Sequence, residues 1–297
     1  MLATAGAAGA LFIVATTLLQ PGDEVIVARP NYATNLETPR SIGADVRTLD
    51  LRFEDGWAVD PDRLAAPMTP RTRLVSLTNP HNPAGALIDE PALRRIVALV
   101  EAHPQARLLV DETYREMTFG EALPPVAALS TRAIGVSGMS KAYGLPGIRI
   151  GCLTARDAEP RTVFLAAKEQ SSSTGSIVDE SIAAHALGRR AALVQGILAG
   201  IEAALETVRS WLAGEPRLEW VEQRGGVVGF PRIRASAGVD VERFHAILAD
   251  RYATAAGRGH WFEQPRAHFR LGYGWPTLPE LREGLANITR ALDDARS

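Results

Sequence analysis

The 297-residue sequence is poor in cysteine, and its only thiol is Cys152. One cysteine cannot form an intramolecular disulfide bond, so the fold cannot depend on one. Residues 148–153 around it are typical of a buried strand. The 6 histidines and this cysteine show no metal-ligand spacing, and no metal site is expected. A reducing, cytoplasmic location is the expectation.

Positive charge is missing from the start of the chain, where no lysine or arginine precedes Arg29. A secretory signal peptide needs a positive segment before its apolar core. Glycines and threonines also make residues 1–19 too polar for a membrane span. We therefore expect a buried helix that opens on a turn of small residues. A weak signal sequence is the alternative interpretation of this apolar run.

The overall charge offers no strong field of either sign. The formal net charge is -2, with 22% charged and 46% hydrophobic residues, as in an ordinary globular protein. Neither nucleic acid nor an anionic membrane is an expected partner. A chain of this length can bury the cores of a large and a small domain.

Lysine is also scarce: Lys141 and Lys168 are the two lysines among 32 basic residues, and the rest are arginines. A guanidinium supplies charge but cannot act as an amine nucleophile. A lysine that persists in such a composition is therefore a candidate for chemistry. Lys168, within the helix-like run 163–170, is better explained as a surface residue.

Short apolar runs alternate with helical segments up to about residue 155, which predicts βα units and a mostly parallel sheet of the α/β class. The runs are continuously apolar, as strands covered on both faces should be. The expected strands are residues 24–28, 45–48, 74–77, 108–110, 133–136 and 148–153. The expected helices are residues 34–42, 61–65 and 90–102, the last starting after Asp89.

Beyond Gly175 the sequence becomes rich in alanine and leucine and predicts long helices, followed by a mixed region. We expect a large domain over residues 1–188 and a smaller C-terminal α+β domain over residues 189–297. The expected helices are residues 177–187, 191–212, 241–250 and 278–292, and the expected strands are residues 218–221, 227–231 and 268–272.

Two motifs place reactive groups after predicted strands. Lys141 lies in the glycine-containing loop 137–144, where open α/β sheets bind ligands and where desolvation can turn an amine into a nucleophile. Asp111 ends a strand, with Tyr114 three residues on, and a protonated pyridine nitrogen would be a suitable cation for it. A solvated lysine and a helix cap or ion pair are the plainer interpretations.

Two further motifs could hold a ligand. Residues 78–85 contain two Asn-Pro pairs, which fix the backbone and present the Asn82 amide as a donor; a structural turn would use similar residues. Residues 4–9 are small and would expose the amides of Ala7 and Ala8 at a helix start to an anion such as phosphate.

In this order the motifs resemble those of class I/II aminotransferases, the aspartate-aminotransferase-like branch of fold-type I pyridoxal-phosphate enzymes, from about residue 4 to the end. The resemblance implies a PLP-transferase-like large domain with a smaller C-terminal domain, pyridoxal 5'-phosphate (PLP) as cofactor, and a homodimer. Lys141, in the Ser-Lys-Ala-Tyr-Gly motif, would carry the cofactor as a Schiff base.

The resemblance also assigns roles around the cofactor ring. Asp111 would pair with the ring nitrogen and Tyr114 would donate to the phenolic oxygen, so that both join Lys141 as catalytic residues. Asn82 would contact the same oxygen and lie near the substrate. Tyr32, in Arg-Pro-Asn-Tyr, would stack on the ring face, where a core tyrosine is the alternative.

Two arginines complete the match. Arg149, in Gly-Ile-Arg-Ile-Gly, would bind the phosphate together with Ser140, Gly138 and the Ala7 and Ala8 amides. Arg270, in His-Phe-Arg-Leu-Gly, would hold the substrate carboxylate through a bidentate guanidinium.

The sequence also departs from the family pattern. Ala7, Ala8 and Gly138 stand where many relatives have a side-chain donor to phosphate, so backbone amides and Arg149 would carry more of the binding. The usual segment before the Gly6 region is absent, which leads us to expect a fragment or a shortened variant.

The expected reaction moves an amino group between an L-α-amino acid and a 2-keto acid. A PLP-dependent lyase, decarboxylase or cyclase would keep the same cofactor residues. A ligand-sensing domain and an inactive or truncated aminotransferase-like domain would also fit the motifs. Trp261, Phe262 and Tyr273 could line an apolar substrate pocket or simply fill a core. His81 is expected to be a loop histidine without a partner.

Overall fold

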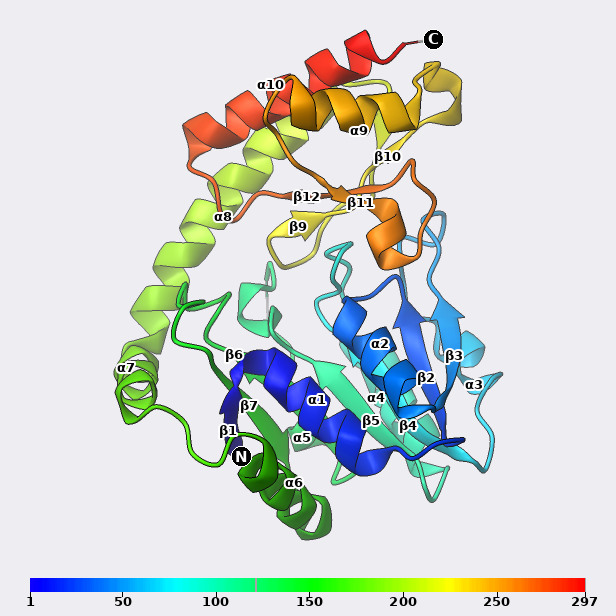
Figure 1. Ribbon diagram of the computed structural model, residues 1–297, viewed down its shortest axis with the longest axis vertical. Coiled ribbons are helices and arrows are strands. Elements are labelled where there is room, and N and C mark those ends of the chain that lie inside the picture. Colours follow the sequence, from blue (N-terminus) through cyan, green and yellow to red (C-terminus); the bar gives the residue numbers. More distant parts are fainter. Residues whose placement is uncertain (121, 297) are drawn as a thin grey trace.

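A seven-stranded sheet forms the centre of the larger half of the molecule (Figure 1). The structure is a computed structural model that describes residues 1–120 and 122–296. Residue 121 of the predicted first domain and residue 297 of the predicted second domain therefore lie outside the described residues. The strand order is β1-β7-β6-β5-β4-β2-β3. The strands are β1 (Leu2–Ala5), β2 (Glu24–Arg29), β3 (Asp45–Asp50), β4 (Thr72–Thr78), β5 (Arg107–Asp111), β6 (Ala133–Gly138) and β7 (Ile150–Ala155).

Strands β2 to β6 run parallel to their neighbours, whereas β7 is antiparallel to β6 and β1 is antiparallel to β7. The predicted α/β class and mostly parallel sheet are therefore confirmed. Because β4, β5 and β6 are parallel, the loops that follow them leave the sheet at one edge.

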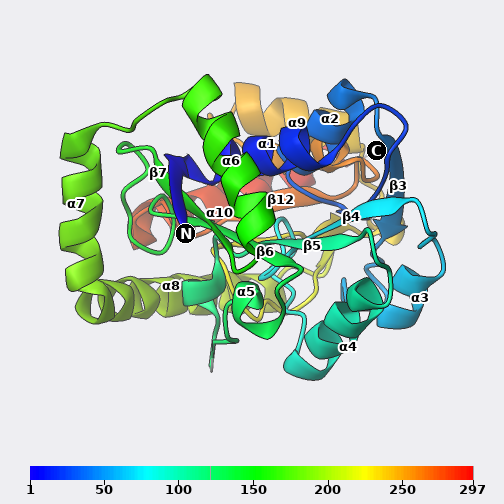
Figure 2. The ribbon, with the colours of Figure 1, turned by 90° about the horizontal axis from the view of Figure 1, so that it is seen from below.

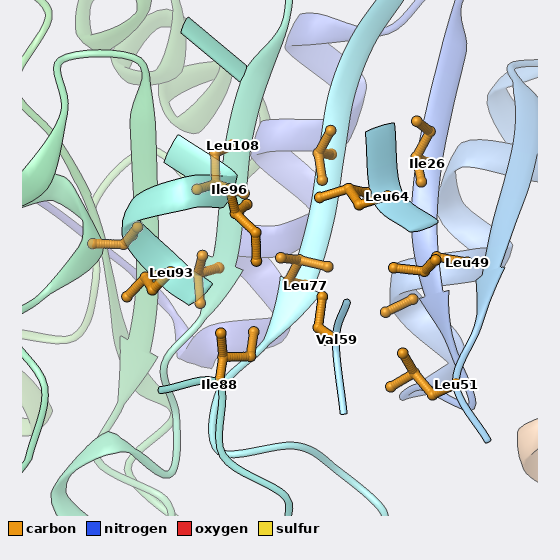
Figure 3. Packing of buried hydrophobic residues seen from close by; sticks show 14 of the residues in the cluster. Ile26, Leu49, Leu51, Val59, Leu64, Leu77, Ile88, Leu93, Ile96 and Leu108 are labelled. Carbon is orange, nitrogen blue, oxygen red and sulfur yellow. The ribbon is translucent and has the colours of Figure 1, made fainter. Parts of the chain in front are cut away.

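Helices cover both faces of this sheet (Figure 2). One face carries α1 (Gly6–Leu18), α2 (Ala33–Ile42) and α6 (Ala158–Ser171), and the other carries α3 (Pro61–Ala65), α4 (Glu90–Glu101) and α5 (Val126–Leu129). The side chains of β2 alternate between the two cores, with Val25 and Val27 facing α1, and Ile26 and Ala28 facing α3 and α4. Figure 3 shows the second core, where Leu64 and Ile96 pack against strand residues.

Local capping explains where two of these helices begin. The Asp89 side chain accepts a hydrogen bond from Ala92 N at 2.9 Å, and Pro91 occupies the first turn of α4. The Asp60 side chain accepts from Asp62 N at 2.9 Å at the start of α3. Both helices begin where the sequence predicts, and α4 ends one residue earlier than predicted.

The start of the chain differs from the prediction. Residues 2–5 form the edge strand β1 and not the opening of a helix, because they pair with β7 from Leu2↔Leu153 to Ala5↔Ile150. The predicted buried helix follows as α1, with Ala10, Leu11 and Val14 in the core.

The expectation of continuously apolar strands is wrong for β3. This strand lies at the other edge of the sheet, where its outer side faces solvent, and Leu49 is its one buried residue.

A smaller α+β unit forms the upper part of Figure 1. Its helices α9 (Val241–Asp250) and α10 (Leu278–Asp294) pack with α8 (Arg190–Ala213) around a core that includes Leu205, Phe244 and Leu285. The strands are short: β8 (Leu218–Glu219), β9 (Val228–Gly229), β10 (Arg232–Ile233), β11 (Gly257–Arg258) and β12 (Phe269–Gly272). Strands β10 and β11 were not predicted. The division into domains at residues 188 and 189 stays a prediction.

The long helix α8 follows α7 (Ile177–Gly188) and extends from the larger unit into the smaller one (Figure 1). Within the described residues it is the one helix whose length and apolar composition would suffice to cross a membrane. Its buried residues Ile201, Ala204, Leu205 and Val208 pack into the core of the smaller unit. Core helices of globular proteins pass the same test of length and composition.

A carboxylate of the smaller unit is bound by arginines of the larger one. Glu263 directly follows the short helix η3 (Gly259–Phe262) and accepts from Arg29 Nη1 at 3.2 Å and from Arg40. Arg29 also contacts Asp50 at 2.8 Å. This ion-pair cluster connects β2 and α2 to the segment that precedes β12.

Candidate active site

Lys141 lies in the loop that follows β6, three residues beyond the strand end. Its Nζ is 5.9 Å from the centroid of the Tyr114 ring, and the side chain remains accessible to solvent. Partial desolvation, together with the positive charges of Arg270 and Arg149, lowers the pKa of Lys141, while Asp111 opposes the change. A larger fraction of the amine is therefore unprotonated near neutral pH than for a free lysine.

Asp111 is the last residue of β5 and is buried. Its Oδ1 accepts hydrogen bonds from Thr113 N at 3.0 Å and from Thr113 Oγ1 at 2.5 Å, which leaves Oδ2 for another donor. Burial raises the pKa of Asp111, and the Thr113 hydrogen bonds and the Lys141 charge only partly oppose this. A cationic donor placed against this carboxylate would stabilise its charged form.

Tyr114 is buried, and burial raises the pKa of its hydroxyl to about 12. The charge of Arg270 lowers this pKa, and Asp111 and Tyr32 raise it. The hydroxyl stays protonated at neutral pH and can act as a hydrogen-bond donor.

An anion cradle forms where α1 begins beside β6 and β7. Gly6 has φ 71°, and a Cβ on it would lie 2.6 Å from Arg149 Nη2. The Arg149 guanidinium donates to Ser140 Oγ at 3.3 Å and to Pro146 O at 2.9 Å. The Ala7 and Ala8 amides belong to the first turn of α1, whose backbone donors have no intrahelical acceptors.

Two glycines allow this close approach. A Cβ on Gly138 would lie 3.4 Å from Ala7 N, and a Cβ on Gly151 would lie 2.5 Å from the same atom. Gly151 was not among the predicted site residues, although it closes the Gly-Ile-Arg-Ile-Gly motif that contains Arg149. The requirement for glycine appears only when β7 and α1 are brought together.

Arg270 comes from β12 of the smaller unit and reaches Asn82 of the larger one. Its Nη1 donates to Asn82 Oδ1 at 3.4 Å, and its guanidinium carbon lies 5.2 Å from the centroid of the Phe262 ring. Asn82 is buried, and Tyr32, which caps α2, is 42% exposed. The exposed ring of Tyr32 can offer a face to a planar ligand.

The predicted aromatic residues separate into different environments. Tyr273 is fully buried in the core of the smaller unit, as core packing would have it, whereas Trp261 is 59% exposed. Phe262 is the aromatic that contacts Arg270. His81 is not an unpartnered loop histidine, because it is buried and its Nε2 lies 2.8 Å from Pro30 O.

Lys168 lies in α6, away from the loop that carries Lys141. It lines a small cavity of about 210 Å³ that Arg149 also lines, together with residues of α7 and the turn before it. The two lysines therefore differ in their surroundings, since Lys141 lies beside Tyr114 and Lys168 lines this cavity.

The chain belongs to the family of aminotransferases of class I and II, whose model matches residues 1–288. Capreomycidine synthase of Streptomyces vinaceus is 34% identical, over 98% of this chain and 74% of that protein. Arginine–pyruvate transaminase AruH of Pseudomonas aeruginosa is 31% identical, over 96% of this chain and 72% of that protein.

Solved structures agree with this assignment. A PLP-dependent aminotransferase from Streptococcus suis superposes with a TM-score of 0.92 at 28% identity, covering 100% of this chain and 77% of that one. The PLP-dependent cyclase OrfR superposes with a TM-score of 0.88 at 30% identity, covering 99% of this chain and 78% of that one. The fold is that of fold-type I, and the chain is a PLP-dependent enzyme of this family.

The donor set fits this cofactor. The phosphate matches the cradle of α1 amides, Ser140 and Arg149, where glycines make room that a Cβ would fill. The buried Asp111 carboxylate, with a raised pKa and a free oxygen, matches a protonated ring nitrogen. Lys141, with a lowered pKa, matches an aldehyde.

Proposed function

We propose that the protein is an aminotransferase that moves an amino group between an L-α-amino acid and a 2-keto acid. The observation that carries this proposal is that Lys141 lies beside Tyr114, while the charges of Arg270 and Asp111 act on the pKa values of both residues. An amine with a lowered pKa next to a carboxylate-binding group is what proton transfer at the Cα of an amino acid requires.

Binding and orientation come from the arginines and amides. Arg149, Ser140 and the Ala7 and Ala8 amides hold the phosphate, with Gly138 leaving space for the approach of α1. Arg270 holds the α-carboxylate of the substrate through two parallel hydrogen bonds. Asn82 accepts a hydrogen bond from Arg270, which supports a position near both cofactor and substrate.

Protons are held at defined atoms around the ring. When bound, PLP supplies an aldehyde and an electron-withdrawing ring that accepts the electrons released at Cα. Asp111 would keep a proton at the ring nitrogen, Tyr114 and Asn82 would donate to the phenolic oxygen, and Tyr32 would cover the ring face. Lys141 would be the base that removes the proton from the substrate Cα and the acid that supplies it to the cofactor.

The fate of the substrate distinguishes the two reactions that the relatives suggest. The similarity to AruH favours arginine as amino donor and pyruvate as acceptor. The similarity to capreomycidine synthase and to the cyclase OrfR favours ring closure within the amino acid. Both reactions would use the same cofactor residues, so the product decides between them.

A homodimer in the cytoplasm is part of the proposal. Helix α7 exposes Ile177, Val178, Ile182 and Leu187, with 75% of Ile177 accessible in the single chain. Several large apolar side chains exposed on one helix are typical of an interface, and a second copy of the chain is the partner that the family resemblance implies. The one cysteine, Cys152, suits a reducing compartment.

The test uses the purified chain with PLP, arginine and pyruvate. The bound cofactor is followed by its visible absorption band, and the products are identified by mass spectrometry. We expect a 2-keto acid from arginine and alanine from pyruvate. Lys141→Ala should abolish both products, and Lys168→Ala should leave them unchanged as the matched control.

The outcomes separate the candidates. A cyclic product without alanine would replace the transaminase proposal with the cyclase. Equal loss of activity in both lysine variants, or full activity of Lys141→Ala, would contradict the assigned role of Lys141.

A further inference from the structure

A buried asparagine lies beneath the loop that carries Tyr32. Asn31 is fully buried, and its Oδ1 accepts hydrogen bonds from Tyr32 N at 2.8 Å, Asn35 Nδ2 at 3.0 Å and Thr78 Oγ1 at 3.0 Å. Its Nδ2 donates to Ala28 O at 3.0 Å. One amide therefore connects the end of β2, the start of α2 and the end of β4.

A buried histidine makes a second connection between the same two segments. His81 Nε2 lies 2.8 Å from the carbonyl oxygen of Pro30, two residues before Tyr32. A carbonyl can only accept, so Nε2 carries the proton and donates it. Burial lowers the pKa of His81 to about 4, and the ring is neutral at pH 7.

The backbone around His81 is held as well. His81 N donates to Ala86 O at 2.8 Å, and Gly85 N donates to His81 O at 2.7 Å, which closes the loop that contains Asn82. Asn79 N donates to Asp111 O at 2.9 Å at the next strand. The segments that carry Tyr32, Asn82 and Asp111 are thereby joined by hydrogen bonds that do not involve those three side chains.

We propose that Asn31 and His81 are positioning residues that hold the Tyr32 loop and the Asn82 loop in a fixed relation to each other. The inference rests on the proposed contacts of Tyr32 and Asn82 with the cofactor. The geometry favours this role over a purely structural one, because each side chain bridges the two segments. Asn31, on the Tyr32 loop, accepts from Thr78 Oγ1 at the end of β4, and His81, on the loop after β4, donates to Pro30 O of the Tyr32 loop.

The consequence for cofactor binding follows from the bonds that are lost. Asn31→Ala leaves three donors without their acceptor, and His81→Leu leaves the Pro30 carbonyl without its donor. Ligand binding must then restore the order of the two loops, which weakens it. We expect the dissociation constant for PLP to rise about tenfold in Asn31→Ala and somewhat less in His81→Leu.

Conservative and distant variants separate positioning from general destabilisation. His81→Gln can still direct an amide N–H at Pro30 O and should recover most of the affinity lost in His81→Leu. Asn287→Ala removes a buried asparagine of the smaller unit, which donates to Thr254 Oγ1 at 2.9 Å. This control should lower Tm and leave the PLP dissociation constant unchanged.

The experiment measures PLP titrations by visible absorption and hydrogen exchange of peptides that cover residues 30–36 and 79–88. Asn31→Ala should accelerate exchange in both peptides, including the one that it does not belong to. Accelerated exchange that is confined to residues 30–36 would overturn the proposal. Equal losses of PLP affinity in Asn31→Ala and Asn287→Ala would overturn it as well.

Tyr32→Ala tests the underlying role separately. If it leaves the PLP dissociation constant unchanged, the assigned contact of Tyr32 fails. Hydrogen exchange then decides by itself whether the two loops are coupled: acceleration in both peptides supports the coupling, and acceleration in one contradicts it.

Discussion

Glu112 offers a stability prediction that can be worked out from the structure. The side chain is buried next to the site, its Oε1 accepts from Val126 N at 2.8 Å, and its Oε2 fills the space above Gly135 where a Cβ would otherwise stand. Burial raises the pKa of Glu112 from 4.5 to about 7. The folded protein therefore keeps this carboxyl protonated where the unfolded chain has released the proton.

The sign of the pH dependence follows directly. Below pH 4.5 both states are protonated, and the group has no effect on the free energy of unfolding. Between pH 4.5 and 7 the folded state binds more protons than the unfolded state, so stability falls as pH rises, and above pH 7 the loss is complete. The difference in pKa corresponds to about 3 kcal/mol at pH 8, as an upper value.

Glu112→Gln removes this titration and keeps a side-chain oxygen for Val126 N. Urea unfolding at pH 5 and pH 8 should show the variant gaining on the wild type by about 2 kcal/mol more at pH 8 than at pH 5. Glu202→Gln, on the exposed side of α8, controls for the loss of a carboxylate. A gain that is the same at both pH values would refute the reasoning, as would a variant that is less stable than wild type at pH 8.

Three further predictions concern the cradle, the substrate and the aromatic core. Gly151→Ala should weaken PLP binding by about tenfold or more in absorption titrations, because the added Cβ would overlap the backbone at Gly6 and displace α1. An unchanged affinity for PLP would show that the cradle tolerates this displacement of α1. Arg270→Lys should lower kcat/KM for the amino acid by roughly tenfold to a hundredfold, since a lysine cannot form two parallel hydrogen bonds with a carboxylate. The dissociation constant for PLP should not change in this variant. His268→Phe should reduce the loss of stability on acidification from pH 6.5 to 4. Burial lowers the pKa of His268 to about 4, and the neutral ring, stacked 5.3 Å from the Phe230 centroid, contributes stability only while it remains uncharged. Thermal melts of the variant that match those of the wild type across this pH range would contradict the prediction.

The strands that the motif residues end or follow could be predicted because each strand has a strong local signal. Apolar runs mark β4, β5 and β6, and the polar residues that follow them, including Asp111 and Lys141, meet at one edge because the strands are parallel. The helix start at Asp89 was likewise visible in the sequence. These features depend on residues that are close in the chain.

The remainder depends on contacts between distant segments. Strand β1 is short and its residues are small, and only pairing with β7 makes it a strand. The need for glycine at position 151 arises because α1 lies against it, and the role of Asn31 arises because Thr78 donates a hydrogen bond to it. The two-residue strands of the smaller unit have no periodicity that a sequence pattern could reveal.

The ion-pair cluster around Glu263 makes ionic strength a variable of the active site. Its arginines are partly exposed, so dissolved salt screens their attraction to this carboxylate. Glu263 directly follows Phe262, whose ring contacts the Arg270 guanidinium. Salt that weakens the cluster would loosen the segment against which Arg270 rests, so the choice of buffer would affect how firmly this arginine, which we propose binds the substrate carboxylate, is supported.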